Sequence, residues 1–231
     1  MKCLGIVGGL GPESTIEYYR FILERYRARM PDGSAPHLII DSLDVNHGIA
    51  MLDAGDLRGL EDYITDSVER LARAGAALAL IAANTPHIVF DEVERRAPIP
   101  MLSIVQATCD HARAQGFTRL ALLGTGFTMR AQFYPEFFTR AGLTLITPDA
   151  AEQSFLHDKY IHELLANKFL PETRRAILAM IERLQKDKAI EAVVLAGTEL
   201  PLLLRGAEPE GLSFLDTTLI HVRAAVEAIL A

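Results

Sequence analysis

Four short segments of this sequence combine glycine, hydroxyl and ionisable residues, and each directly follows an apolar run. They are Gly8-Gly9-Leu10-Gly11-Pro12-Glu13-Ser14-Thr15, Ala82-Ala83-Asn84-Thr85-Pro86-His87, Gly124-Thr125-Gly126-Phe127-Thr128 and Ala196-Gly197-Thr198-Glu199-Leu200-Pro201. Glycine allows a tight turn and close approach of the backbone to a ligand, and the N–H groups at the start of a following helix attract an anion. Together with the hydroxyls, these groups indicate a site for a small carboxylate.

Two ionisable residues in these segments could take part in chemistry. His87 is a candidate proton carrier, because imidazole titrates near neutral pH, and Glu199 could bind an ammonium group or orient a base. Structural roles are equally open. Asn84, Thr85 and Thr128 can cap helices, a glutamate in a first helical turn is favourable without any ligand, and the histidine could point away from the turn.

The glycine-rich first segment does not follow the G-x-G-x-x-G pattern, so a dinucleotide cofactor is not favoured. The two cysteines, Cys3 and Cys109, have no metal-ligand spacing, and we expect neither a metal site nor a disulfide scaffold. Buried, inert thiols and a reducing cytoplasm are the ordinary expectation for such a chain.

Composition narrows the class of protein. The chain has 231 residues, of which 50% are hydrophobic and 23% charged, and its formal net charge is -7. An acidic balance argues against nucleic acid as a partner, because phosphate binding needs a basic surface. No apolar run reaches the roughly 18 residues of a membrane span, and the short run at residues 3–7 reads as a first strand rather than a signal peptide.

Apolar runs and helical patterns alternate along the chain. Strands are predicted at residues 3–7, 38–40, 78–82, 120–123, 143–146 and 192–195, because these runs are continuously apolar, as in strands covered on both faces. Helices are predicted at residues 14–30, 57–74, 105–115, 128–140, 157–166, 172–185 and 217–230. This alternation predicts an α/β fold with mostly parallel sheets.

The chain also resembles itself. Ile6-Val7-Gly8-Gly9 is similar to Leu122-Leu123-Gly124-Thr125, and the segment at residues 80–85 is similar to the one at 194–199 when Ala83 is set on Gly197. A duplication predicts two similar lobes related by a pseudo-twofold axis, one of residues 1–98 plus 217–231 and one of residues 99–216. All four segments would then line a cleft between the lobes. Chance similarity between ordinary βα turns is the alternative explanation.

The ordered set of motifs resembles the aspartate/glutamate/hydantoin racemase family. It consists of the first glycine segment, Asn84-Thr85-x-His87, Leu123-Gly124-Thr125, Gly197-Thr198-Glu199 and, near the end, Asp216-Thr217-Thr218-x-x-His221. The resemblance implies two α/β lobes with the substrate between them, a cofactor-independent enzyme and a homodimer. It also implies a mechanism with two thiols on opposite faces of the substrate, one before each of the Asn-Thr and Thr-Glu pairs.

Those two positions are Ala83 and Gly197, which carry no ionisable group, so the two-thiol mechanism cannot operate in this sequence. The other binding residues that the resemblance implies are present: Gly9, Gly11, Asn84, Thr85, Thr125, Thr128 and Thr198. His87, Glu199 and His47 are the candidate bases. Lys159 and Lys168 are further groups that could reach a substrate side chain.

Three interpretations follow. The first, which we adopt as the prediction, is a cytoplasmic isomerase that acts on a small, acidic amino acid or related carboxylate through non-cysteine acid/base groups. The second is a divergent protein that binds a small carboxylate without converting it, or a lyase or different isomerase with the same site. The third is an unrelated α/β protein with similar turns.

Overall fold

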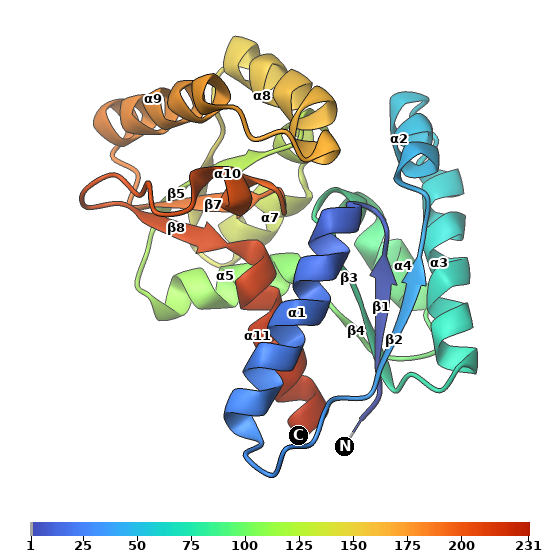
Figure 1. The fold of residues 1–231 in the computed structure, drawn as a ribbon. Helices are drawn as coiled ribbons and strands as arrows, with labels where there is room; N and C mark the ends of the chain where they lie inside the picture. Colours follow the sequence, from blue (N-terminus) through green and yellow to red (C-terminus); the bar gives the residue numbers. More distant parts are fainter. Residues whose placement is uncertain (1) are drawn as a thin grey trace. The chain divides into compact units, whose positions relative to one another are not determined.

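Two four-stranded parallel sheets lie at the centre of the computed structural model, which describes residues 2–231. The chain divides into two compact units (Figure 1). Unit 1 contains the residues up to Ala107 together with Thr218–Ala231, and unit 2 contains Thr108–Thr217. The predicted α/β class with mostly parallel sheets is confirmed. The predicted lobe limits, after residues 98 and 216, stay a prediction beside these units.

The sheet of unit 1 has the strand order β2-β1-β3-β4. Its elements, in chain order, are β1 (Leu4–Gly8), α1 (Pro12–Arg29), β2 (Leu38–Ser42), α2 (Val45–Asp53), α3 (Leu57–Arg73), β3 (Leu78–Ile81), the 3-10 helix η1 (Thr85–Val89), α4 (Phe90–Arg96) and β4 (Met101–Leu102), and the C-terminal α11 (Thr217–Leu230) completes the unit. Helix α5 (Ile104–Ala114) contains the division between the units.

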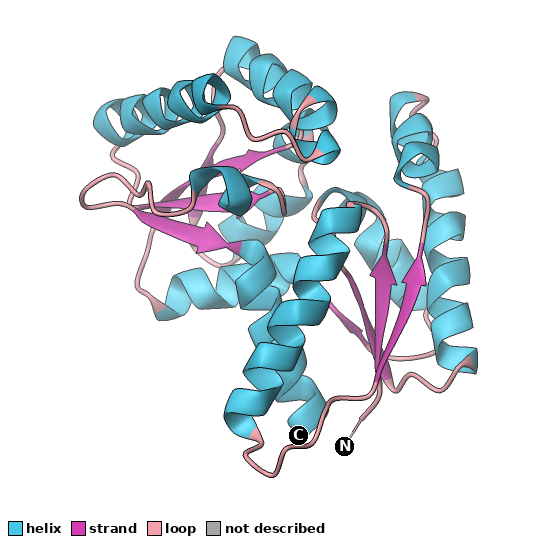
Figure 2. Ribbon diagram, in the orientation of Figure 1, coloured by secondary structure: helices cyan, strands magenta, loops and turns pink. Residues whose placement is uncertain are grey.

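The central strands β1 and β3 of the unit 1 sheet are buried on both faces, which explains their continuous apolar runs. One core cluster combines Leu4, Ile6 and Leu80 with residues of α1 and α11, and the other combines Val7 and Ile81 with residues of α3 and α4. Figure 2 shows the helices around the strands. Alternate residues of each strand therefore supply opposite cores.

Unit 2 repeats this arrangement with the strand order β6-β5-β7-β8. Its elements are β5 (Arg119–Gly124), α6 (Gly126–Arg130), α7 (Phe133–Arg140), β6 (Thr144–Ile146), α8 (Ala150–His162), the 3-10 helix η2 (Leu164–Ala166), α9 (Pro171–Lys188), β7 (Ala192–Ala196), α10 (Leu200–Leu204) and β8 (Ser213–Asp216). The buried residues of α8, α9 and α10 share a core with Leu123 and Leu195. Because β1 and β3 have the same places in one sheet as β5 and β7 have in the other, the topology agrees with an internal repeat.

Several elements differ from the sequence predictions. The single helix predicted at residues 128–140 is wrong: α6 ends at Arg130 and α7 starts at Phe133. The helix predicted at 157–166 starts much earlier, at Ala150, because Asp149 and Glu152 form a reciprocal capping box there. The sequence analysis also missed β4, β8, α2, α4 and α10. The two missed strands are short and lack a continuous apolar run.

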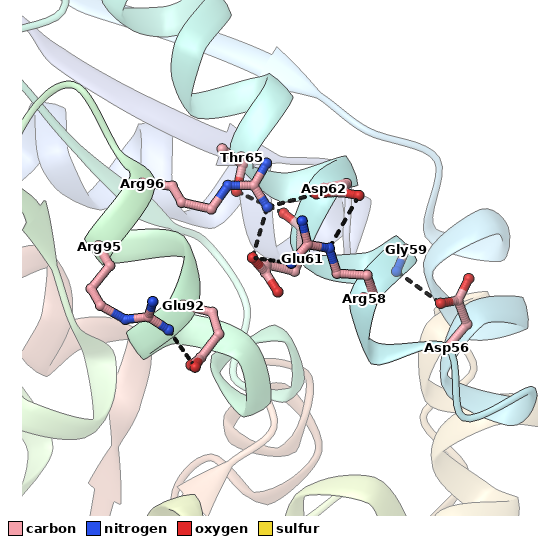
Figure 3. Close-up of polar contacts among 9 residues, drawn as sticks. All are labelled: Asp56, Arg58, Gly59, Glu61, Asp62, Thr65, Glu92, Arg95 and Arg96. Carbon is pink, nitrogen blue, oxygen red and sulfur yellow. Dashed lines mark hydrogen bonds and ion pairs between the residues drawn. The ribbon is translucent and has the colours of Figure 1, made fainter.

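The segment after β3 is anchored to α3 by ion pairs (Figure 3). The Arg96 guanidinium, at the end of α4, donates hydrogen bonds to Glu61 (2.7 Å) and Asp62 (2.6 Å) of α3. Arg58 lies 3.7 Å from Glu61 and 3.6 Å from Asp62. The Arg96 hydrogen bonds to Glu61 and Asp62 raise the pKa of its guanidinium, with the Glu61 bond as the largest cause. They fix α4 to the helix that covers the same face of the sheet.

Across the part of the chain that the structure describes, no helix is both long and apolar enough to cross a membrane.

Candidate active site

The first glycine segment of unit 1 forms a tight turn between β1 and α1. Gly9 has a φ of 79°, and a side chain there would overlap the backbone of Leu43, so only glycine fits. The Gly9 N–H donates to the Thr15 hydroxyl (2.8 Å), and the Ser14 hydroxyl donates to the Ala82 carbonyl (2.9 Å). Gly11 is the N-cap of α1 and supplies no side-chain cap. Hydrogen bonds thus tie this turn to the end of β3.

His87 lies in η1, immediately after β3, and both of its ring nitrogens are occupied by backbone groups. The Ile104 N–H donates to Nε2 (3.2 Å), and Nδ1 donates to the Ala83 carbonyl (3.0 Å). The ring is buried and stacks on Phe90, with 4.9 Å between the centroids. Burial, with the nearby His221 as a smaller cause, lowers the pKa of His87 to about 3. This histidine is neutral at physiological pH and holds backbone segments together.

His221, from the motif near the end of the chain, has a similar environment in unit 1. Its Nδ1 accepts from the Tyr18 hydroxyl (2.9 Å), and its Nε2 donates to the Leu102 carbonyl (3.1 Å). Burial lowers the pKa of His221 to about 4. The motif histidine therefore joins α11 to α1 and to the end of β4.

The other unit 1 candidates differ in burial. Asn84 is buried and Thr85, the first residue of η1, is half-buried. Ala83 is also buried. His47 lies on α2, where it is exposed and packs edge-on against Tyr63 (4.9 Å between centroids). The structure brings Asn84 and Thr85 to the end of β3, next to β1, and leaves His47 on an outer helix.

The turn after β5, in unit 2, is built from hydroxyls and one histidine. Thr125 caps α6, since its hydroxyl accepts from the Thr128 N–H (3.2 Å), and the two threonine hydroxyls are themselves 3.2 Å apart. The Gly126 N–H donates to Nδ1 of His157 (3.2 Å), a residue of α8 that the sequence analysis did not single out. The N-cap role expected for Thr128 is therefore taken by Thr125.

The turn after β7 holds a buried carboxylate. Glu199 accepts hydrogen bonds from the Tyr160 hydroxyl and from the Thr198 hydroxyl (2.9 Å). The Glu199 N–H donates to the same Tyr160 oxygen (3.3 Å). Glu199 is 2% exposed and Tyr160 4%. A buried carboxylate keeps its charge at low cost only when donors surround it, and two hydroxyl groups supply that role here.

Tyr160 occupies the space beside Gly197. A Cβ atom added at Gly197 would lie 2.5 Å from Cε2 of Tyr160 and 2.9 Å from its hydroxyl oxygen. Any side chain at this position would therefore displace the tyrosine ring. The glycine belongs to a sequence motif, whereas its partner is distant in the sequence and lies on α8.

The two unit 2 turns adjoin one another. Strands β5 and β7 pair in parallel register, with Gly124 opposite Ala196, so their carboxyl ends meet at one edge of the sheet. Helix α8 contributes to both turns, with His157 bonded to one and Tyr160 to the other. Unit 2 thus gathers Thr125, Thr128, Thr198 and Glu199 at a single edge.

The remaining candidates have ordinary surroundings. Lys159 pairs with Glu163 (2.6 Å) one turn along the same helix. Both cysteines are buried. Burial raises the pKa of the Cys3 thiol, and raises that of Cys109 to about 11, so both thiols stay protonated and unreactive near neutral pH.

Comparisons with known proteins agree with this architecture. A family model described as Asp/Glu/Hydantoin racemase matches residues 7–225. The broad specificity amino-acid racemase RacX of Bacillus subtilis is 22% identical over 99% of this chain and 98% of its own length.

Two solved structures are similar over 100% of both chains. A proposed Asp/Glu racemase from Yersinia pestis has a TM-score of 0.90 at 30% identity, and an aspartate racemase homologue from Pyrococcus horikoshii has a TM-score of 0.84 at 33% identity. Aspartate racemase from Picrophilus torridus, at 21% identity, shares the fold, with a TM-score of 0.78. The match over almost the whole length shows that this chain belongs to the Asp/Glu/hydantoin racemase family.

Proposed function

We propose that the chain is a cofactor-independent isomerase-type enzyme that moves the α-proton of a small, acidic amino acid or related carboxylate. In this proposal Glu199 is the group that finally accepts the proton, and the substrate lies at the carboxyl end of β7. The observation that carries the proposal is the buried Glu199 carboxylate, which is held by the Tyr160 and Thr198 hydroxyls at a strand end.

A glutamate suits this role because a carboxylate in a water-poor site is a stronger base than one in water. His87 suits it poorly, because both ring nitrogens are engaged by backbone groups and its pKa is lowered to about 3. His47 is exposed on α2, and we give it no part in the reaction. The base therefore belongs to the turn after β7.

The adjoining turn after β5 supports binding of a carboxylate. Its Thr125 and Thr128 hydroxyls are 3.2 Å apart, and β5 lies directly beside β7. We propose that these hydroxyls hold the substrate carboxylate while its α-carbon faces the turn after β7, where Thr198 supports Glu199. Gly9, Gly11, Asn84 and Thr85 remain predicted ligands on unit 1.

The names of the relatives support an amino acid as substrate. They include a broad specificity amino-acid racemase and an aspartate racemase homologue. We keep the predictions of a homodimer and of a cytoplasmic location alongside this substrate class.

The test is α-proton exchange in heavy water, followed by NMR with each enantiomer of aspartate, glutamate and a wider amino-acid panel. Loss of the α-proton signal in the wild-type protein and its retention in Glu199→Gln is the expected result. Chiral chromatography of the same samples separates exchange with inversion from exchange alone. A folded wild-type protein that exchanges no member of the panel overturns the proposal.

A second candidate is a protein that binds a small carboxylate without converting it. This candidate is favoured by Ala83 and Gly197, which carry no ionisable group, and by the backbone hydrogen bonds that occupy His87. Calorimetric binding of an amino acid without any α-proton exchange would favour it. Loss of a β-substituent from the substrate, seen in the same NMR spectra, would instead indicate a lyase.

A further inference from the structure

We propose that Tyr160 is the residue that exchanges the proton with the substrate and that Glu199 acts through the tyrosine hydroxyl. The inference deepens the proposed function and rests on it. It assigns the catalytic contact to a side chain of α8 that belongs to none of the sequence motifs.

The Tyr160 ring packs directly against Gly197. The tyrosine ring fills the volume that a side chain at position 197 would need, and its oxygen lies 2.9 Å from the place of that missing Cβ. The hydroxyl therefore lies beside Gly197, directly after the end of β7, where a ligand of a parallel sheet is expected. Glycine at position 197 is what makes room for it.

A chain of hydrogen bonds joins Tyr160, Glu199 and Thr198. The Tyr160 hydroxyl donates to Glu199, the Glu199 N–H donates back to the same oxygen at 3.3 Å, and the Thr198 hydroxyl donates to the carboxylate at 2.9 Å. Glu199 is 2% exposed. The tyrosine hydroxyl thus connects the space beside Gly197 to the carboxylate through one hydrogen bond.

Burial and charge determine the resting protonation state of Tyr160 beside Glu199. Burial, and then the Glu199 charge, raise the pKa of Tyr160 well above its ordinary value. The phenol accordingly keeps its proton at rest and donates it in a hydrogen bond to Glu199, which is the proton acceptor of the proposed relay. Proton removal must then be a relay in which both protons move together.

The relay balances without any other reactant. The substrate Cα–H bond breaks, its electron pair stays on the substrate as an enolate-type carbanion, and its proton goes to the Tyr160 oxygen. The original phenol proton goes to the Glu199 carboxylate, which becomes neutral. The reverse movement returns a proton to the same face of the carbanion, so this pair alone gives exchange with retention of configuration.

The experiment compares three single-residue variants in the heavy-water exchange assay. Tyr160→Phe keeps the ring beside Gly197 and removes only the oxygen. Tyr134→Phe is the matched control, because Tyr134 is also buried in unit 2 and lies outside the proposed site. Glu199→Gln reports on the proton acceptor. Thermal unfolding of each variant verifies that it is folded.

We expect Tyr160→Phe to lose about 100-fold or more of the exchange rate, as for loss of a general acid–base group, while Tyr134→Phe keeps the wild-type rate. A Tyr160→Phe protein that exchanges at the wild-type rate, while Glu199→Gln does not, overturns the inference and leaves Glu199 as the direct base. No exchange by the wild-type protein overturns the proposed function and the inference with it.

A second readout separates catalysis from packing. Replacing Tyr160 with 3-fluorotyrosine keeps its shape and makes the phenol more acidic. If the phenol oxygen takes part in the proton transfer, the exchange rate at fixed pH changes while the stability stays that of the wild type. An unchanged exchange rate, with unchanged stability, contradicts the assignment.

Discussion

The turns after β3 and β7 occupy equivalent places in two sheets of the same strand order, yet they use their polar side chains differently. After β3, His87 is bonded through both ring nitrogens to backbone groups. After β7, Glu199 is bonded to two side-chain hydroxyls. The first arrangement fixes the fold locally, whereas the second holds a buried carboxyl group at a strand end.

This difference teaches that equivalent positions in a repeat need not share a role. The segment after β3 is structural along its length, from His87 through Phe90, on which the histidine stacks, to Arg96, which anchors α4 to α3. In the segment after β7, the glycine at position 197 lets a distant side chain reach the turn. Substitutions in the two turns should therefore affect different measurements.

The largest expected effect is that of Glu199→Gln on proton exchange. Loss of a general base lowers the rate by about 10²–10⁴-fold. Gln keeps the shape and can still accept from Tyr160, so the melting temperature should change little compared with the rate. If Glu199→Gln exchanges within a factor of two of the wild-type rate, the turn after β7 has no catalytic role and the proposed difference between the two turns is wrong.

His87→Ala should have the opposite profile. It removes the hydrogen bonds of the ring to the Ile104 N–H and the Ala83 carbonyl and opens a cavity beside Phe90, which together cost about 2–5 kcal/mol of unfolding free energy. Urea unfolding measures this loss. A variant with wild-type stability, or one that loses exchange activity while it stays stable, would reverse the roles of the two turns.

Gly197→Ala tests the space that Tyr160 fills. The new Cβ would lie 2.5 Å from the ring, and overpacking of this kind costs about 1–3 kcal/mol. Gly48→Ala is the control, because the nearest atom to its Cβ is the flexible end of Leu10 at 3.3 Å. Adding Tyr160→Ala should relieve the clash. A double-mutant cycle in which the changes in unfolding free energy are additive would contradict direct packing between the two positions.

Acid should weaken unit 1 through its buried histidines. Burial lowers the pKa of His87 to about 3 and of His221 to about 4, so below the ordinary value of about 6.5 only the unfolded chain takes up these protons. The buried histidines therefore do not lower the free energy of unfolding above about pH 6.5. Between that pH and pH 4, each histidine lowers it by up to about 1.4 kcal/mol per pH unit. Urea unfolding at pH 7.5 and at pH 4.5 measures this loss of unfolding free energy. His221→Gln should flatten this dependence, and an equal slope in that variant would refute the assignment.

The smallest effect is expected for Arg96→Met, at the other end of the segment after β3. The change removes the ion pairs of α4 with Glu61 and Asp62 (Figure 3). Partly exposed pairs contribute little to the free energy of unfolding, and salt weakens them. The loss of unfolding free energy in Arg96→Met should therefore be smaller in high salt. A loss that does not depend on salt would indicate packing of the arginine stem instead.

The sequence was sufficient for the fold because burial on both faces leaves continuous apolar runs. All six predicted strands exist, within one or two residues of their predicted limits. The missed strand β8, Ser213–Asp216, alternates in burial, and β4 has only two residues. The predicted helix over residues 128–140 failed because side-chain periodicity continues across the break between Arg130 and Phe133.

The candidate site was less accessible to sequence reasoning. Residues that follow strands, such as Thr125 and Glu199, could be found because parallel strands place their ends together. Tyr160 could not, because it reaches the turn from a helix and only the three-dimensional packing brings its ring to Gly197. His87 was identified as ionisable, but the burial that lowers its pKa and the Ile104 N–H that occupies its Nε2 come from the three-dimensional packing.

The return of α11 to unit 1 has a consequence for synthesis on the ribosome. Val222, Val226 and Ile229 of this helix share a core with Leu4 and Ile6 of the first strand, whereas unit 2 is one continuous segment, Thr108–Thr217. Nascent unit 2 has therefore left the ribosome in full before unit 1 can close its core, although unit 1 begins first. During this interval the apolar face of the first strand awaits its last partner, which makes it a natural client surface for chaperones.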